Sequence, residues 1–176
     1  MTHSSHVAAH GDAGQAARVK VVGVPHAYSV VATEPLAEGG LLFSVHGVMK
    51  DRASRHSIQI DEGTHVDVEP GVTPEEMQIR YPWRFLNHSC DPNAVLRGRD
   101  FVALRTIAAR EGVTYNYNTT EFDMAAPFAC RCGHDRCLGP ISGFAHLPPA
   151  EQTRLRPWLA DHLRRRLDST LRSTPA

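Results

Sequence analysis

The sequence predicts a mainly β fold, built from short strands with few helices. From Arg18 onward the apolar segments are short, and glycine and proline residues interrupt them at close intervals. Only one short helical pattern lies among these segments before the chain changes character near its C-terminus. The expected strands lie near residues 18–24, 28–33, 41–48, 56–60, 64–68, 93–97, 101–105 and 113–117. Many short strands with one small helix are typical of a β-rich core.

Two of these elements have clear local support. In the fourth strand, Ile58 and Ile60 alternate with polar neighbours such as Gln59, which is the pattern of a half-buried strand. Residues 74–80 predict a short helix, because Thr73 can cap it and a proline occupies its first position.

The C-terminal segment carries apolar residues at helical spacing. They are Leu155, Trp158, Leu159, His162, Leu163 and Leu167. Pro157 is expected to start a new helix or to kink the existing one. Packing of this apolar stripe on the chain's own core is the favoured interpretation, and a dimer or partner contact is the alternative. A nucleic-acid-binding arm is disfavoured, because Asp161 and Asp168 interrupt the positive face formed by the arginines at 164–166.

Length and composition set broad limits. A chain of 176 residues has a single-domain length, and its formal net charge is zero, so nothing global indicates binding to nucleic acid or to an anionic membrane. No apolar run approaches the roughly 18 residues of a membrane span. Residues 1–17 read as a disordered tail without the apolar region of a secretory signal, which favours a cytoplasmic protein. Seventeen of the 19 basic residues are arginine, which favours a GC-rich bacterial genome.

The chain has four cysteines, and their spacing predicts a metal site. Cys90 stands alone, whereas Cys130, Cys132 and Cys137 form a short Cys-x-Cys-x4-Cys knuckle that contains glycine. A tetrahedral structural zinc site takes four such thiolates, and in reducing cytosol this spacing favours a metal over disulfides. His134 lies inside the knuckle and is the rival ligand, ranked lower because four thiolates already complete the tetrahedron.

Three ordered motifs carry a resemblance to a known family. They are Asn87-His88-Ser89-Cys90, the run Glu111-Gly112-Val113-Thr114-Tyr115-Asn116-Tyr117, and the cysteine knuckle. Together they resemble SET-domain protein lysine methyltransferases with a post-SET zinc segment, of a small bacterial type. Residues 31–42 are similar to the family's opening strand, turn and strand, so the resemblance covers about residues 18–145.

The resemblance implies a fold and a division of the chain. The fold would be the SET-domain β-clip, with a pseudoknot-like threaded site and few short helices. The tail would be followed by a SET domain over 18–123, a post-SET zinc segment over 124–146 and a C-terminal helical extension over 147–176.

The resemblance also implies S-adenosylmethionine as cofactor, structural zinc, and a protein or peptide substrate that presents a lysine. Tyr117 matches the family's catalytic tyrosine, and Tyr115 matches the position that affects how many methyl groups are added. A tyrosine there implies mainly monomethylation. The implied cofactor-binding residues are Ala27, Tyr28, Arg84, Phe85, Asn87, His88 and Leu138. Arg84 and Phe85 would lie in a strand that leads into the site, and Leu138 would close over the adenine.

Methyl transfer to lysine needs a neutral amine, although the unperturbed pKa of lysine is about 10.4. Entry into an apolar channel and proximity to the cofactor's positive sulfur both lower that pKa. The chemistry therefore requires no strong base, and the motifs show none.

One departure from the family keeps alternatives open. Most members carry a Gly-x-Gly pair where this chain has His26-Ala27-Tyr28-Ser29-Val30, so a non-catalytic peptide-binding module remains the second hypothesis. A small-molecule enzyme on the same scaffold is the third. A cysteine hydrolase using Cys90 and His88 is disfavoured, since these side chains are expected on opposite faces of a strand.

Overall fold

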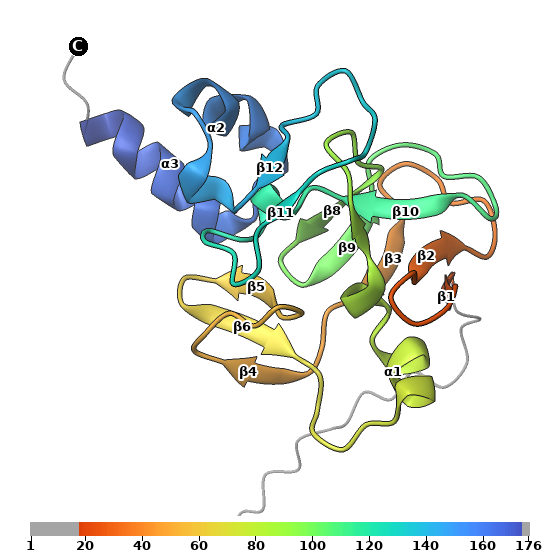
Figure 1. Ribbon diagram of the computed structural model, residues 1–176. Coiled ribbons are helices and arrows are strands. Elements are labelled where there is room, and N and C mark those ends of the chain that lie inside the picture. Colours follow the sequence, from red (N-terminus) through yellow and green to blue (C-terminus); the bar gives the residue numbers. More distant parts are fainter. Residues whose placement is uncertain (1–17, 174–176) are drawn as a thin grey trace, which may run out of the picture.

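Short strands arranged in small sheets are the main regular structure among the described residues, and loops connect them (Figure 1). The computed structural model describes residues 18–173, and the predicted disordered tail lies outside the described residues. The strands are β1 (Val19–Val22), β2 (Ser29–Ala32), β3 (Leu41–Ser44), β4 (Val48–Lys50), β5 (Ile58–Asp61), β6 (Thr64–Asp67), β7 (Asn87–His88), β8 (Ala94–Arg97), β9 (Asp100–Ala103), β10 (Gly112–Tyr115), β11 (Phe128–Ala129) and β12 (Pro140–Ile141). The helices are α1 (Pro74–Arg80), α2 (Pro149–Leu155) and α3 (Asp161–Ser173), with 3₁₀ turns at Pro82–Phe85, Tyr117–Thr119, Phe144–His146 and Arg156–Trp158. The predicted mainly β fold is confirmed.

Strand β10 joins two sequence motifs that are far apart along the chain. The four-stranded sheet has the order β1-β2-β10-β7, in which β10 runs antiparallel to β2 and parallel to β7. Thr114 lies opposite Asn87, and Tyr115 lies opposite His88. The backbone N–H of Ser89 extends this pairing by donating to the carbonyl of Tyr115 at 3.0 Å. The parallel pairing therefore places the Asn-His motif beside the tyrosine motif.

The remaining strands form two three-stranded sheets, β3-β9-β8 and β4-β6-β5, and a small β11-β12 hairpin. The single strand expected over 41–48 is wrong, because the chain leaves one sheet at Ser44 and enters the other at Val48. Gly47 allows this passage. It has a φ of 145°, and a Cβ atom there would lie 2.2 Å from the carbonyl oxygen of Asp67.

The alternating burial expected around Ile58 is wrong at Gln59, which was expected to face solvent. Gln59 is buried rather than solvent-facing, and the register shifts between Gln59 and Asp61. Its backbone N–H donates to the carboxylate of Glu121 at 2.8 Å, and its side-chain oxygen accepts from the N–H of Phe122 at 2.8 Å. These bonds satisfy the buried polar groups of Gln59, so alternation of residue types fails to predict its direction.

Helix α1 forms as expected. The hydroxyl of Thr73 accepts from the N–H of Glu76 at 3.2 Å, and the carboxylate of Glu76 accepts from the N–H of Thr73 at 3.0 Å. This reciprocal capping box, with a proline in the first turn, fixes where the helix begins.

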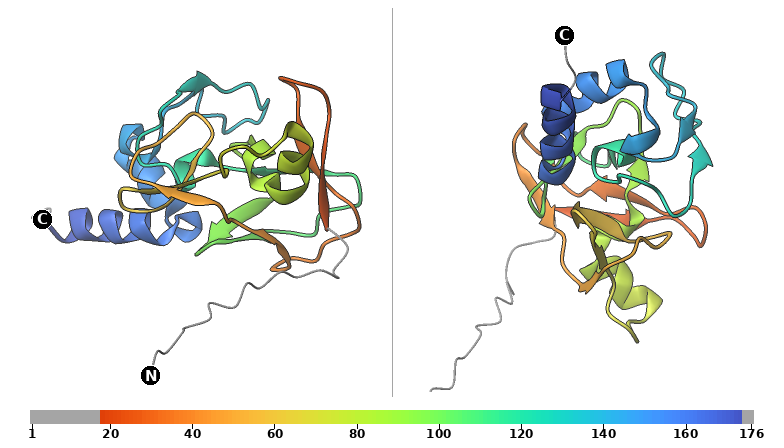
Figure 2. Two further views of the ribbon diagram at one scale, coloured as in Figure 1. Left: turned by 90° about the horizontal axis from the view of Figure 1, so that it is seen from below. Right: turned by 90° about the vertical axis from the view of Figure 1, so that its left-hand side faces the viewer.

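The C-terminal helices pack on the chain itself. Their apolar side chains form a second buried cluster, consisting of Phe144, Leu147, Leu155, Leu159, Leu163 and Leu167. Helix α3 is also tied to the β5–β6 turn, where Arg165 pairs with Asp61 at 2.6 Å and Arg166 pairs with Glu62 at 3.2 Å. Figure 2 shows α2 and α3 together, apart from α1. Pro157 lies in the 3₁₀ turn that separates the two helices.

None of the helices among residues 18–173 combines the length and the apolar character needed to cross a bilayer.

Candidate active site and metal centre

Two tyrosine rings lie against each other where β10 ends. The strand stops at Tyr115, and Tyr117 begins a 3₁₀ turn, so the strand expected over 113–117 is too long by two residues. Asn116 ends the strand, because its side-chain oxygen accepts from the N–H of Asn118 at 3.1 Å. The rings of Tyr115 and Tyr117 still meet, with centroids 4.8 Å apart.

Tyr117 lies at the junction of two cavities. One is a groove of about 1050 Å³, and the other is a narrow cavity of about 70 Å³. Tyr117, Leu86 and Arg84 line both. The hydroxyl of Tyr117 donates to the carbonyl of Leu86 at 2.6 Å, and burial raises the pKa of this hydroxyl far above its ordinary value. The group at the junction is therefore a protonated, oriented hydroxyl.

Aromatic side chains from separate segments form one wall of the groove. The rings of His88, Tyr117 and Phe128 lie edge to face, with centroids 5.3–5.9 Å apart. Nearby, Tyr28 packs edge-on against Phe85 at 5.2 Å. Such a wall suits the flat face of a ring system.

Five of the seven expected cofactor residues line the groove, and two do not. Those that line the groove are Tyr28, Arg84, Phe85, Asn87 and His88. Asn87 donates from its side-chain nitrogen to the carbonyl of Tyr28 at 3.0 Å, which holds the loop before β2 against the groove. Ala27 belongs to this loop, is exposed and does not line the groove. Leu138 packs on the second buried cluster instead of lining the groove.

Arg84 and Phe85 do not lie in a strand as expected. They belong to the 3₁₀ turn Pro82–Phe85, which a proline begins directly after α1. Proline fixes φ and lacks an N–H donor, so this position favours a helical turn over a strand in a sheet.

His88 connects the tyrosine to a cysteine. Its Nδ1 accepts from the N–H of Tyr117 at 3.2 Å, which places the proton of the neutral ring on Nε2. Nε2 faces the sulfur of Cys90 at 3.3 Å, so the expectation of opposite faces is wrong. The N–H of Ser89 continues the pairing of β7 with β10, and side chains two positions apart in such an extended chain share a face. Burial lowers the pKa of His88 to about 4, so the ring is neutral near pH 7.

A cysteine hydrolase remains disfavoured despite this contact. Burial raises the pKa of Cys90 to about 12, whereas a nucleophilic cysteine needs a lowered pKa. The residue is also only 6% exposed.

The four cysteines meet in space. The sulfur atoms of Cys90, Cys130, Cys132 and Cys137 all lie within 4.8 Å of one another, and those of Cys90 and Cys130 are 3.9 Å apart. Zn–S bonds of roughly 2.3 Å in a tetrahedron place sulfur atoms about 3.8 Å apart. The donor set and its spacing therefore fit a zinc ion.

Groups around this cluster support the same fit. The backbone N–H of Leu138 donates to the sulfur of Cys90, and that of Cys132 donates to the sulfur of Cys130, each at 3.4 Å. Such donors stabilise metal-bound thiolates. His134, the rival ligand, lies outside the cluster and pairs with Asp91 at 3.5 Å.

Glu121 is a site residue that the motifs did not indicate. It is 6% exposed and lines the narrow cavity with Tyr115 and Tyr117. Its carboxylate accepts from the N–H of Gln59 and from the hydroxyl of Thr120 at 3.2 Å. Burial raises its pKa from an ordinary 4.5 to about 7. In the sequence, Glu121 is marked only by its position shortly after the tyrosine motif. That position does not indicate that its side chain points inward.

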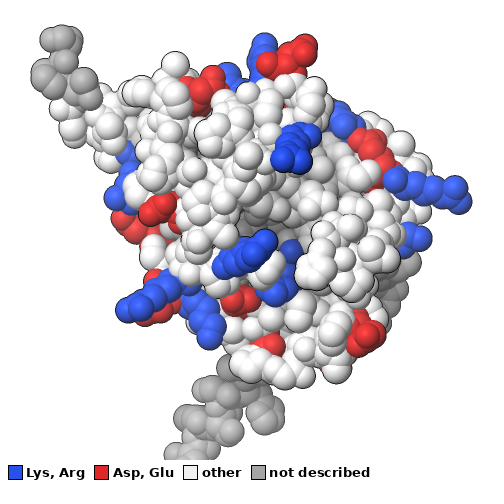
Figure 3. All heavy atoms as spheres, viewed as in Figure 1, with Lys and Arg blue, Asp and Glu red and all other residues white. Residues whose placement is uncertain are grey.

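Figure 3 shows basic and acidic side chains interspersed around a hollow on the face drawn. No field of one sign dominates this face, as the zero net charge leads one to expect.

A β-rich domain with one tyrosine at the meeting point of two cavities is suited to bringing two ligands together. Residues 27–118, more than half of the 176 residues, match the family model described as SET domain. The chain therefore belongs to the SET-domain family.

Several known proteins are similar to this chain. Methyltransferase flvH of Aspergillus flavus is 31% identical over 105 residues, which are 57% of this chain and 56% of flvH. Histone-lysine N-methyltransferase ash1 of Drosophila melanogaster is 27% identical over 62% of this chain and 6% of ash1. The chain thus spans about half of the first relative and a small part of the second.

Among solved structures, a complex of KRYPTONITE with mCHH DNA, an H3(1-15) peptide and SAH is similar at a TM-score of 0.49. It has 22% identity, over 69% of this chain and 29% of that chain. The methyltransferase domain of human SETMAR is similar at a TM-score of 0.48, with 17% identity over 66% of this chain and 54% of that chain.

Proposed function

We propose that this protein transfers a methyl group from S-adenosylmethionine to a lysine side chain of a protein, and mainly adds one methyl group. The position of Tyr117, at the junction of the groove and the narrow cavity, carries this proposal. Membership of the SET-domain family and relatives named histone-lysine N-methyltransferases support it.

The groove would hold the cofactor. Tyr28, Phe85, Asn87 and His88 line it and offer two aromatic faces, an amide and a neutral imidazole, with Arg84 at its inner end. Such a groove fits a ligand with an adenine ring and an amino-acid end. Ala27 and Leu138 do not line the groove, so they would contribute indirectly rather than by direct contact. When bound, S-adenosylmethionine supplies an electrophilic methyl group on a positive sulfur.

The narrow cavity would admit the lysine. The positive charges of Arg55 and Arg84, which line it, disfavour the charged ammonium and so lower the amine's pKa. Glu121 faces this cavity with a carboxylate whose pKa is about 7. It can take the proton from the lysine nitrogen, which leaves a lone pair on that nitrogen and a neutral carboxylic acid at Glu121. The Tyr117 oxygen then orients the amine toward the groove.

A zinc ion bound to the four cysteines would have a structural role and would take no part in the methyl transfer. The knuckle contributes Cys130, Arg131 and Cys132 to one side of the groove, so a metal that orders the knuckle also completes the cofactor wall.

The decisive experiment is transfer of an isotope-labelled methyl group from S-adenosylmethionine to histones and to proteins of a cell lysate. The labelled residue is then identified by mass spectrometry. We expect labelled lysine in protein bands. Cofactor binding without any transfer would indicate a small-molecule enzyme. Absence of cofactor binding in calorimetry would indicate the peptide-binding module and contradict the proposal.

Glu121→Gln should lower the rate of transfer by about 10²-fold or more, the usual contribution of a positioned proton acceptor. In the unmodified protein, kcat/KM should rise with pH through about 7 as Glu121 loses its proton. The glutamine variant should lack this rise. Initial rates between pH 5.5 and 9 test both expectations.

Stability gives an independent measurement of the same group. The native state keeps the Glu121 proton up to about pH 7, whereas the unfolded chain releases it near 4.5. The free energy of unfolding should therefore fall as pH rises through this window, and Glu121→Gln should reduce that fall. Glu38→Gln, at an exposed acid, is the matched control and should change neither profile. An unchanged pH–rate profile in Glu121→Gln would exclude the proton-acceptor role.

Tyr115→Phe should shift the products from monomethyl-lysine toward di- and trimethyl-lysine. Tyr115 lines the narrow cavity beside Tyr117, and removal of its hydroxyl makes room for a bulkier amine. Mass spectrometry of a modified peptide measures the distribution. Tyr81→Phe, at a buried tyrosine that lines neither cavity, should leave it unchanged. Mainly trimethylated product from the unmodified protein would refute this assignment.

A further inference from the structure

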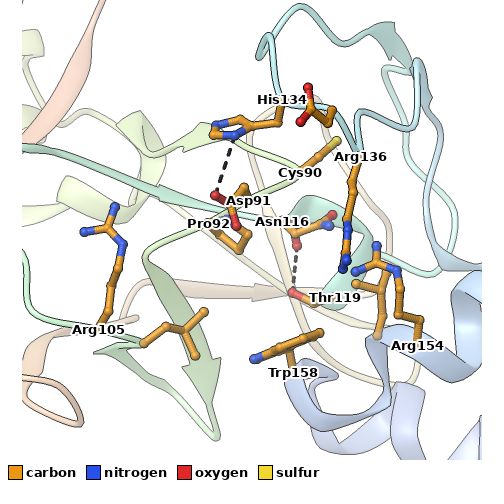
Figure 4. Close-up of a pocket in the computed structure, with 13 residues that line it drawn as sticks. Cys90, Asp91, Pro92, Arg105, Asn116, Thr119, His134, Arg136, Arg154 and Trp158 are labelled. Carbon is orange, nitrogen blue, oxygen red and sulfur yellow. Dashed lines mark hydrogen bonds and ion pairs between the residues drawn. The ribbon is translucent and has the colours of Figure 1, made fainter.

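A third cavity lies on the other side of the cysteine cluster. It has a volume of about 530 Å³, within the usual range for small-molecule sites, and shares no lining residue with the groove or the narrow cavity. Figure 4 shows that its walls come from the segment after Cys90, the 3₁₀ turn after β10, the cysteine knuckle and the C-terminal helices.

Asn116 supplies a buried donor to this cavity. The residue is 1% exposed, and its side-chain nitrogen has no hydrogen-bond partner among the described residues. Its side-chain oxygen is already engaged by the N–H of Asn118, so the amide cannot be reversed without facing one N–H group with another. The free N–H₂ group is therefore fixed in place. A buried donor without a partner is unusual in native proteins and asks for an acceptor.

Arginine side chains also line the cavity, with Arg136 and Arg154 on the same side as Asn116 and Arg105 on the far side (Figure 4). Arg136, which belongs to the knuckle, forms no ion pair with any residue in the described part of the chain. Arg154 pairs with Glu151 at 2.7 Å, and Arg105 pairs with Glu111 at 2.7 Å, so these two charges are partly balanced. Arg136 is thus the guanidinium left to bind a ligand.

Other residues that line the cavity are apolar. Trp158, Leu155, Leu104 and Pro92 offer apolar surface. The acidic residues Asp91 and Asp135 also line the cavity; Asp91 is largely exposed and pairs with His134. Hydrogen-bond donors beside the flat apolar surface of Trp158 select a molecule that has both an anionic group and a flat apolar part.

We propose that this cavity binds a small organic anion with a flat apolar body. Its carboxylate or phosphate oxygens accept hydrogen bonds from the side chains of Asn116 and Arg136, and its body packs on Trp158. A guanidinium matches the two oxygens of either anion, so carboxylate and phosphate share the recognising chemistry.

Nuclear magnetic resonance on the full, zinc-loaded chain tests this proposal. The signals to follow are the side-chain N–H₂ of Asn116 and the indole N–H of Trp158, during titration with benzoate, phenyl phosphate and inorganic phosphate. We expect saturable shifts of both signals with benzoate or phenyl phosphate. Tighter binding of one of them identifies the anion as carboxylate or phosphate. Inorganic phosphate should bind at least about tenfold more weakly, because it lacks the apolar body.

Two variants and a control make the test specific. Arg136→Ala should weaken binding about tenfold or more, and Asn116→Asp, which keeps the acceptor for Asn118 but replaces the donor, should abolish it. Arg52→Ala, at an exposed arginine outside all three cavities, should have no effect. Zinc content and circular dichroism show that each variant is folded. Absence of saturable shifts with all three anions would overturn the proposal. Equal affinity of inorganic phosphate, or unchanged binding in folded Arg136→Ala, would do the same.

Discussion

Replacing Tyr117 with phenylalanine should lower the rate of methyl transfer by about 10²–10³-fold, the usual effect of losing one preorganised polar group at a reacting centre. The hydroxyl is held by a 2.6 Å bond to the carbonyl of Leu86 and lies where the groove meets the narrow cavity. The hydroxyl would therefore act on the amine and the methyl group during transfer, and it would contribute little to the affinity for the cofactor. The dissociation constant for S-adenosylmethionine should change by less than about threefold.

Single-turnover kinetics and calorimetry separate these two quantities. Asn87→Ala is the matched variant with the opposite expectation, because Asn87 lines only the groove and holds the Tyr28 loop. It should weaken cofactor binding first and affect the chemical step less. Full activity of Tyr117→Phe on a verified substrate would show that the proposed mechanism is wrong.

Cys132→Ser should release the metal and loosen the knuckle while most of the β core stays folded. The purified protein should contain about one zinc per chain, held by four thiolates. A serine oxygen is a poor replacement for a thiolate ligand, so the knuckle would lose the metal that joins its three cysteines to Cys90. Since Cys130, Arg131 and Cys132 line the groove, cofactor affinity should fall at least about tenfold.

Elemental analysis, calorimetry and circular dichroism measure the three effects. The main buried cluster contains no knuckle cysteine, which is why the β signal should persist. His134→Ala is the control. It alters the knuckle outside the sulfur cluster, so zinc should remain bound. Freshly purified protein without metal would refute the zinc assignment.

Much of the fold was predictable because local chemistry decides it. The Thr73 cap fixes α1, and glycine and proline residues mark the ends of most strands. The apolar stripe of α3 is buried within the chain, as the favoured interpretation required, although the dimer contact stays a prediction. The domain boundaries at 123/124 and 146/147 also stay predictions. The second buried cluster draws on residues from both sides of them, including Phe122 and Leu138.

Two missed features, the burial of Gln59 and the inward direction of Glu121, depend on partners that are distant in sequence. Gln59 is buried because the carboxylate of Glu121 and the backbone N–H of Phe122 satisfy its polar groups, and Glu121 faces the narrow cavity beside that same contact. The sequence around Gln59 does not reveal its contact with Glu121, and the sequence around Glu121 does not reveal its contact with Gln59. The contact between His88 and Cys90 is local, because side chains two positions apart in an extended chain share a face, and the expectation of opposite faces overlooked this.

The pairing of β10 also has a consequence for biosynthesis. During translation, β2 and β7 emerge from the ribosome well before β10, the strand that lies between them in the sheet. Until Gly112–Tyr115 has been made, β2 and β7 have no common partner. Tyr117, which lines both cavities, has not been synthesised at that stage either. The four-stranded sheet can therefore form only after β10 has been synthesised and has inserted between β2 and β7. This insertion closes long loops and has a high cost in conformational entropy. The growing polypeptide stays inert until its site residues have nearly all been added.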